Sequence, residues 1–336
     1  MTQSASAQTP VFVDQVSREA IDPRLNPVAR EIAVGAARGP GLPAAFPAKR
    51  AAFDQVFRDL AGPPVDVANV QDARVRRPDG GEVPVRIYRP ASGTLPVLVW
   101  THGGGFEKGG LDSHDAPLRR LANACGCAVV SVGYRLAPEH RFPAQTDDAY
   151  AVLTWAAREA AAQRFDGGRI AVGGDSVGGN LASVSAIRAR DEGGPSIALQ
   201  VLFYPVTDVT LSSDSWRRFA NGPWLSRAYE ENALQRQYLP AGHDQRDPRV
   251  SPLYADPRGL PPAFVADAEF DGYRDEGQAY ARRLNEAGAS VTARIYPGMI
   301  HDFFLMTGRL PAARQLVDDA GYELRRAFGT LPTGER

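Results

Sequence analysis

A glycine-flanked serine constrains the fold of this 336-residue chain more than any other feature. Residues 174–178 (GDSVG) stand between residues 169–172 (RIAV), which predict a short buried strand, and residues 179–190 (GNLASVSAIRAR), which predict an amphipathic helix with Ala, Leu and Ile on its apolar face. Small residues permit a sharp reversal from strand to helix, and such a turn holds the Ser176 hydroxyl above the edge of a sheet. The segment therefore predicts an α/β protein with a serine nucleophile.

A second glycine-rich segment lies about 70 residues upstream of this serine. Residues 102–106 (HGGGF) follow the apolar run 95–100 after a single threonine, and a strand that ends in three glycines leaves backbone N–H groups uncovered. Alone, three glycines also make an ordinary flexible turn. Followed by the serine turn in this order, they indicate the oxyanion-hole element that lipases and esterases place after a strand.

Further segments extend this pattern in chain order. With the two glycine-rich motifs, residues 109–115, 134–144 (YRLAPEHRFPA), 247–253 (DPRVSPL) and 271–277 (DGYRDEG) make the chain resemble the bacterial hormone-sensitive-lipase family of carboxylesterases. The resemblance covers most of the chain. It implies an α/β-hydrolase fold, with a mostly parallel eight-stranded sheet flanked by helices, a helical cap, and neither a metal nor an organic cofactor.

The net charge and the hydropathy of the chain argue against some classes of binding partner. Thirty-eight Lys and Arg against 39 Asp and Glu give a net charge of −1, which leaves no electrostatic footprint for nucleic acid or an anionic membrane. Residues 1–10 are polar, and no apolar stretch is long enough to span a bilayer. We expect a soluble cytoplasmic protein that acts on a small-molecule ester, although export by an unusual route stays open. The oligomeric state, a homodimer included, is also left open.

The two cysteines do not indicate a metal or redox site. Cys125 and Cys127 are separated by one residue, whereas a metal site needs more ligands and a redox pair has two residues between its cysteines. A disulfide across one residue would also be strained. We expect two small buried side chains.

Alternating strand-like and helix-like segments predict a doubly wound sheet. The first two strands are polar and are joined by the turn signal 78–81 (PDGG), so they should form an antiparallel hairpin at the sheet edge. The later strands are mostly continuous apolar runs, as expected of parallel strands covered on both faces. The predicted strands are 70–77, 83–88, 97–101, 128–134, 170–174, 198–204, 263–268 and 291–296.

Two regions fall outside this alternation. Residues 1–60 show helical periodicity, interrupted at 39–41 and at Pro43. Residues 205–238 carry several large aromatic side chains, among them Trp216, Phe219, Trp224 and Tyr229, that favour either a surface loop or a lid. In the family that the chain resembles, both regions build a cap over the active site. The expected division is a cap segment at 1–60, core at 61–204, a cap insertion at 205–240 and core at 241–336.

Ser176 needs a base within hydrogen-bonding distance and a carboxylate to orient that base. Of the five histidines, His301 follows the predicted strand 291–296 on a loop and comes last in the chain, as the order Ser, acid, His requires. His102 belongs to the oxyanion segment. His114 and His140 lie in family segments with no catalytic role, and His243 lies in a polar loop.

The predicted orienting acid is Asp271, which matches the first acid of the family motif D-P-L-x-D-E-G. Gly272 and Tyr273 replace the usual Pro-Leu of that motif. Asp275 and Glu276 are rivals that fit better in the first turn of the following helix, where its dipole favours acids, and Glu269 is a weaker rival.

The resemblance also supplies the oxyanion donors, the N–H groups of Gly104, Gly105 and Val177, with Gly103 assigned to a tight turn instead. Two residues depart from the family. Val177 replaces the usual alanine and, because it is β-branched and stiff, should narrow the acyl pocket. Asp302 stands where the family often has glycine; we expect a solvated surface carboxylate, the alternative being a charge that raises the basicity of His301.

These residues predict a serine carboxylesterase that hydrolyses short-chain acyl esters through an acyl-enzyme. A different class, a receptor without catalysis, is the alternative, since the plant gibberellin receptors resemble this family but lack the catalytic histidine. Amidase, lactonase and deacetylase activities would use the same triad and also remain open.

Overall fold

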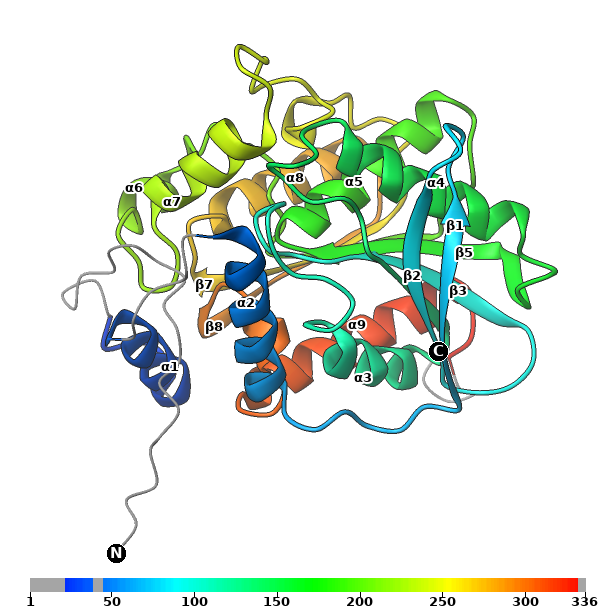
Figure 1. Cartoon of the computed structure of the whole chain (residues 1–336), viewed down its shortest axis with the longest axis horizontal. Helices are drawn as coiled ribbons and strands as arrows, with labels where there is room; N and C mark the ends of the chain where they lie inside the picture. The colour runs from blue at the N-terminus through cyan, green and yellow to red at the C-terminus, as the bar shows by residue number, and fades with distance from the viewer. Residues whose placement is uncertain (1–21, 39–44, 332–336) are drawn as a thin grey trace, which may run out of the picture.

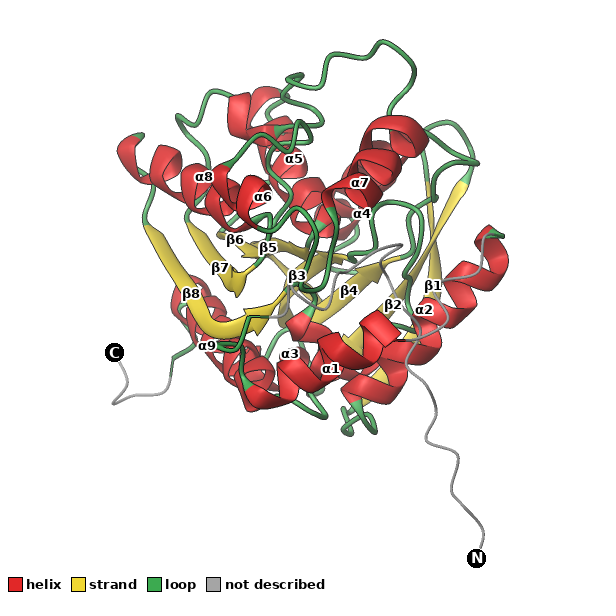
Figure 2. Cartoon of the chain, turned by 90° about the vertical axis from the view of Figure 1, so that its left-hand side faces the viewer, coloured by secondary structure: helices red, strands yellow, loops and turns green. Residues whose placement is uncertain are grey.

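The computed structural model describes residues 22–38 and 45–331. Within them an eight-stranded sheet has the order β1-β2-β4-β3-β5-β6-β7-β8 (Figures 1 and 2). Each strand overlaps a predicted one. The strands are β1 Asn69–Arg76, β2 Glu82–Arg89, β3 Leu95–Thr101, β4 Ala128–Val132, β5 Phe165–Asp175, β6 Leu199–Phe203, β7 Ala263–Phe270 and β8 Val291–Ile300.

The sheet is mostly parallel, as predicted. Strand β2 pairs antiparallel with both β1 and β4, and the remaining neighbours pair in parallel. The hairpin of β1 and β2 lies at one edge of the sheet, and β8 forms the other edge.

The end of β8 differs from the prediction. The strand continues through Pro297 to Ile300, which pairs with Phe270 after an irregularity in the β7–β8 ladder. Pro297 and Gly298 suggested an earlier end, but an edge strand tolerates a residue without an N–H donor. His301 therefore follows the strand directly, and the loop predicted before it is wrong.

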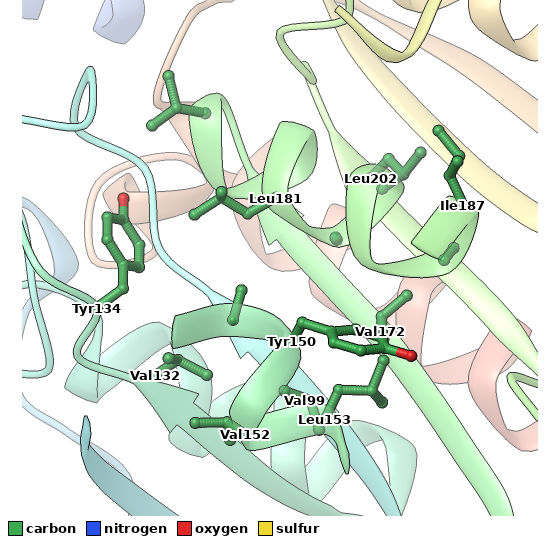
Figure 3. Packing of buried hydrophobic residues seen from close by; sticks show 14 of the residues in the cluster. Val99, Val132, Tyr134, Tyr150, Val152, Leu153, Val172, Leu181, Ile187 and Leu202 are labelled. Carbon is green, nitrogen blue, oxygen red and sulfur yellow. The ribbon is translucent and has the colours of Figure 1, made fainter. Parts of the chain in front are cut away.

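Helices cover both faces of the sheet because its central strands are apolar on both sides (Figures 1 and 2). Helices α4 (Ala144–Arg158), α5 (Val177–Asp191) and α8 (Arg274–Glu286) lie on one face. Helices α3 (Asp115–Cys125) and α9 (Pro311–Phe328) lie on the other. Figure 3 shows Leu153 of α4 and Leu181 of α5 packed over Val99 and Val172 of the sheet.

The two regions outside the alternation contain helices. In the N-terminal region, α1 (Pro27–Arg38) and α2 (Phe46–Ala61) bury the apolar faces that their periodicity predicted. The interruption predicted at 39–41 and Pro43 lies outside the described residues. After β6 come α6 (Asp214–Arg218), α7 (Arg227–Glu230) and a π-helix (Glu231–Tyr238). The aromatic side chains of residues 205–238 are buried: Trp216, Phe219, Trp224, Tyr229 and Tyr238.

Two properties bear on the class of protein. No helix among residues 22–38 and 45–331 combines the length and the apolar character needed to cross a membrane. In the same part of the chain, no group of three or more His, Cys, Asp or Glu side chains is arranged to hold a metal ion. Cys125 and Cys127 are buried free thiols, as predicted.

Candidate active site

Ser176 lies on the turn between β5 and α5. Its backbone has φ 55° and ψ −124°, a conformation that non-glycine residues rarely adopt and that packing must enforce. The neighbouring glycines permit that packing, since a Cβ atom on Gly174 would lie 2.3 Å from the Gly178 carbonyl and one on Gly178 would lie 2.0 Å from the Thr101 oxygen. The Ser176 N–H donates to the Phe203 carbonyl at 2.9 Å, which fixes the turn on strand β6.

The structure brings His301 and Asp271 to this serine from two other strand ends. Asp271 follows β7 and His301 follows β8. His301 Nε2 lies 2.8 Å from Ser176 Oγ, and His301 Nδ1 lies 2.6 Å from Asp271 Oδ2. All three residues are 2–4% exposed, so this hydrogen-bonded chain is shielded from bulk water.

The charges around His301 favour its protonated form. Burial alone would lower its pKa, but the carboxylates of Asp271 and Asp302, assisted by Glu230, outweigh burial and raise the pKa to about 9. The rings of Tyr204 and Tyr273 pack beside the imidazole, with centroids 4.6 Å and 5.2 Å away. Ring packing thus fixes the position of the imidazole, and the nearby carboxylates stabilise its protonated form.

The rival carboxylates have other partners. Asp275 Oδ2 accepts the Ser215 N–H at 2.9 Å, from its place in the first turn of α8. Glu276 Oε1, in the same turn, accepts the N–H groups of two residues that follow β6, at 2.9 and 3.0 Å. Glu269 accepts the Gly298 N–H at 2.9 Å.

The three expected oxyanion donors have free N–H groups. Gly104 and Gly105 have φ values of 118° and 65°, which glycine adopts without strain. Within residues 22–38 and 45–331, the N–H groups of Gly104, Gly105 and Val177 donate to no protein acceptor. The N–H of Val177 begins α5, where a helix has no internal acceptor. The Gly103 N–H, in contrast, donates to Asp175 Oδ1 at 3.1 Å.

This arrangement fits acyl transfer. A serine hydroxyl hydrogen-bonded to an imidazole that is itself bonded to a carboxylate can lose its proton as it attacks a carbonyl carbon. Free N–H groups beside the nucleophile, at the start of a helix, can stabilise the negative charge that develops on the carbonyl oxygen.

Comparison with known proteins identifies the family. A sequence model of the alpha/beta hydrolase fold matches residues 98–305. The carboxylesterase NlhH of Mycobacterium tuberculosis is 41% identical over 253 residues, covering 74% of this chain and 79% of that protein. The ethyl acetate hydrolase of Pseudomonas putida is 38% identical over 265 residues, covering 76% and 82%.

Solved structures agree. An alpha/beta hydrolase from the metagenome of Lake Arreo matches with a TM-score of 0.87 and 40% identity, covering 92% of this chain and all of that chain (100%). An esterase of Pyrobaculum calidifontis matches with a TM-score of 0.84 and 38% identity, covering 90% and 98%. The chain belongs to the bacterial hormone-sensitive-lipase family of carboxylesterases. It is a carboxylic ester hydrolase with the α/β-hydrolase fold, and the alternative of a receptor without catalysis is set aside.

In this carboxylesterase, a buried pair that the sequence did not single out supports the glycine segment 102–106, the expected oxyanion segment. Asp175, which precedes the serine, accepts the Gly103 N–H and lies 3.1 Å from His114 Nε2. His114 Nδ1 in turn lies 3.0 Å from Ser113 Oγ. The serine turn and the oxyanion segment are therefore linked through one carboxylate. No sequence signal marks this link, because its residues are far apart in the chain.

A second unpredicted group joins the oxyanion segment to α7. Glu107 accepts a hydrogen bond from the Tyr229 hydroxyl, and Lys108 Nζ donates to the same hydroxyl at 2.8 Å. Both charged residues are at most 4% exposed. Two adjacent charges after a glycine turn suggest a surface loop in the sequence, and only the tertiary structure shows that α2 and α7 cover them.

The prediction of a solvated surface carboxylate at Asp302 is wrong. The residue is 5% exposed, and its Oδ2 accepts the Trp224 Nε1–H at 2.9 Å. Its Oδ1 lies 3.6 Å from His301 Nε2, and its charge is among those that raise the pKa of His301. The physical reason is that residues 205–238 cover this position, which local sequence does not reveal.

Proposed function

We propose that Ser176, His301 and Asp271 form the catalytic triad of a serine carboxylesterase that hydrolyses short-chain acyl esters through an acyl-enzyme. The observation that carries the proposal is the unbroken chain of hydrogen bonds from Asp271 through His301 to Ser176, at 2.6 and 2.8 Å. These distances are those of a nucleophile, a base and an orienting acid.

In the first half of the reaction, Ser176 Oγ attacks the ester carbonyl carbon while His301 Nε2 takes the hydroxyl proton. Asp271 stabilises the imidazolium through Nδ1. The N–H groups of Gly104, Gly105 and Val177 stabilise the oxyanion, and the alcohol leaves with the proton that His301 returns. In the second half, water repeats these steps on the acyl-enzyme and releases the carboxylic acid.

The proposed preference for short acyl chains rests on the side chain of Val177, the residue after the serine. Val177 is fully buried beside Ser176, and its branched side chain occupies space that the usual alanine would leave to the acyl group. The relative from Pseudomonas putida is named for ethyl acetate, an ester with a short acyl chain.

We further propose that residues 1–60 and 205–240 form a cap over a core composed of 61–204 and 241–336. In the second segment, Tyr229 of α7 forms hydrogen bonds with Glu107 and Lys108, which directly follow the expected oxyanion segment. Trp224, from the same segment, donates a hydrogen bond to Asp302, the residue after His301. These contacts support a cap that excludes water during the reaction.

The direct test uses a fluorophosphonate probe, which forms a covalent bond with an activated serine. Wild-type protein should be labelled, and Ser176→Ala should lose both labelling and ester hydrolysis while its melting temperature is maintained. Ser183→Ala is the matched control, because its hydroxyl bonds to the Gly179 carbonyl within α5 and lies outside the proposed triad. Persistent labelling of Ser176→Ala would contradict the assignment of the nucleophile.

A further inference from the structure

A second carboxylate, that of Asp302, lies near Nε2 of His301, the nitrogen that faces Ser176. Asp302 has φ 64° and ψ 7°, a left-handed conformation that turns the chain immediately after the histidine. Its Oδ1 lies 3.6 Å from His301 Nε2, whereas Asp271 binds the opposite nitrogen, Nδ1. The imidazole is therefore flanked by carboxylates on both sides.

The tryptophan of the cap segment fixes the orientation of this carboxylate. Trp224 Nε1–H donates to Oδ2 at 2.9 Å, and an indole N–H is only a donor. Oδ1 accepts no hydrogen bond within residues 22–38 and 45–331, and the side chain keeps 7% exposure. One oxygen is thus anchored and the other is available on the Ser176 side of the histidine.

The available oxygen is placed to accept a hydrogen bond from a molecule bound at Nε2. Hydrogen bonds between oxygen and nitrogen or oxygen span about 2.7–3.2 Å, so one water molecule can reach two acceptors 3.6 Å apart. Water has two hydrogens, and it can donate one to Nε2 and the other to Oδ1.

We propose that Asp302 is a further catalytic residue, which orients the water that hydrolyses the acyl-enzyme and so favours water over alcohols as the acyl acceptor. This inference rests on the proposed acyl-enzyme mechanism.

The step itself is a hydrolysis with balanced atoms. The water oxygen forms a bond to the acyl carbon, and His301 Nε2 takes one water proton. Asp302 Oδ1 accepts a hydrogen bond from the other hydrogen and takes no proton. The bond from the acyl carbon to Ser176 Oγ then breaks, His301 gives its proton to Oγ, and the carboxylic acid leaves.

The selectivity for water over alcohols follows from the number of O–H hydrogens in each molecule. An alcohol has a single O–H, which must point to His301 for the alcohol to be activated. Its oxygen then has no hydrogen left for Asp302, so the carboxylate assists water alone. Without this carboxylate, added alcohol should capture more of the acyl-enzyme.

The test is the partition of one acyl-enzyme between water and methanol. Wild type and Asp302→Asn hydrolyse p-nitrophenyl butyrate in buffer containing methanol, and the ratio of methyl butyrate to butyric acid is measured. Both products come from the same intermediate and the same base, so a change in the basicity of His301 affects both alike. Asparagine is the matched replacement, since it has the same shape and tolerates positive φ.

The expected result is a methyl ester to acid ratio that rises about tenfold in Asp302→Asn, the effect of losing a hydrogen bond to a charged group. Because an indole N–H can only donate, Trp224 holds the amide with its oxygen toward the indole and its NH₂ group toward the water. Trp224→Phe should raise the ratio in the same direction by a smaller factor.

Two variants serve as controls. Trp216→Phe makes the same indole-to-phenyl change at a buried tryptophan whose Nε1 has no partner within the described chain. Asp275→Asn removes a carboxylate that bonds to Ser215 instead of His301. Both should keep the wild-type ratio, and a rise in either one equal to that in Asp302→Asn would overturn the inference.

A ratio within about twofold of wild type in Asp302→Asn, with the acyl-enzyme still formed, would also overturn it. Should that variant not fold, Asp302→Gly, which accepts the same backbone conformation, must show the rise. Failure of the proposed function is recognised separately. In that case wild type shows no acyl-enzyme burst and no covalent label on Ser176.

Discussion

Asp271 and Asp275 lie close together in the chain, yet their carboxylates have different partners. Asp271 Oδ2 is 2.6 Å from His301 Nδ1, while Asp275 Oδ2 accepts the backbone N–H of Ser215. A carboxylate on the imidazole selects the tautomer that leaves Nε2 free to accept the serine proton. A carboxylate at the first turn of a helix stabilises only local structure.

Asp271→Asn should therefore lower kcat/KM by about ten-thousand-fold, the effect of the same change in serine proteases, because the amide favours the wrong tautomer. Asp275→Asn should cost only about 0.3–1 kcal/mol of stability. Steady-state kinetics and thermal melting of both variants distinguish the two roles. A larger loss of activity in Asp275→Asn would mean that the triad acid is misassigned.

The charges beside His301 also predict the pH dependence of activity. Burial lowers the pKa of His301, but Asp271, Asp302 and Glu230 together raise it to about 9. The imidazole must be unprotonated to act as a base, so kcat/KM should rise about tenfold per pH unit below this pKa and level off above it.

Measurement of kcat/KM against pH checks this, and Asp302→Asn should move the rising limb to lower pH because one of the raising charges is gone. The test must be run at constant ionic strength, since salt screens such charges. A wild-type limb centred at or below the ordinary histidine pKa of 6.5 would contradict the prediction.

At the scale of single residues, the sequence named three residues that the structure brings together, but it did not predict their surroundings. Ser176, Asp271 and His301 could be selected because each follows a predicted strand and the three occur in the order typical of the fold. Asp302 was misplaced on the surface because its burial depends on Trp224, a residue far away in the chain. Contacts of this kind leave no local pattern.

At the scale of elements, the start of α5 combines a strained turn with a free N–H group. Val177 is the first residue of this helix, and its N–H has no acceptor in the described part of the chain. The side chain and the N–H can be tested separately. Val177→Ala should alter activity by less than about tenfold, because the donor is retained, and longer acyl chains should be accepted.

Val177→Pro removes the donor and should cost about 3–4 kcal/mol of transition-state stabilisation. Proline is tolerated at the first position of a helix, but it also restricts Ser176 before it. Thermal melting and fluorophosphonate labelling must therefore accompany the kinetics. A variant that melts normally and is acylated at the wild-type rate would show that the donor is elsewhere.

The strands were predictable because their side-chain pattern is local. Strands β3, β4 and β6 are short, mostly apolar runs, and the polar hairpin of β1 and β2 is joined by a glycine-containing turn. The misplaced end of β8 has an equally local cause. Proline and glycine ordinarily end a strand, but the pairing of Ile300 with Phe270 continues this one to the site.

At the scale of the whole molecule, hydrogen bonds join the proposed cap to the core beside the candidate active site. The Tyr229 hydroxyl of α7 forms hydrogen bonds with Glu107 and Lys108, which follow the glycine segment 102–106. The Tyr273 hydroxyl donates a hydrogen bond to Glu230 of α7 at 2.5 Å. The sequence indicated a lid through its aromatic side chains but not these polar ties, because each joins segments more than 40 residues apart (43 for the Tyr273–Glu230 bond).

The proposed cap, fixed in this way, would limit the space for the acyl chain. The aromatic side chains of residues 205–238 and the branched side chain of Val177 are buried, and a packed interior yields to a longer acyl chain only at a cost in free energy. The preferred substrates should therefore be short, from acetate to hexanoate. Values of kcat/KM for p-nitrophenyl esters of increasing chain length should peak in this range and then fall.

Ser176→Ala, measured on the same esters, supplies the background of uncatalysed hydrolysis. Val177→Ala offers a matched test of the cause, because removing two methyl groups should move the peak toward longer chains without changing the proposed triad. A kcat/KM that climbs steadily from short esters to emulsified long-chain triglycerides would contradict the prediction. In that case the cap would have to open widely, and the hydrogen bonds of Tyr229 and Trp224 would break during each turnover.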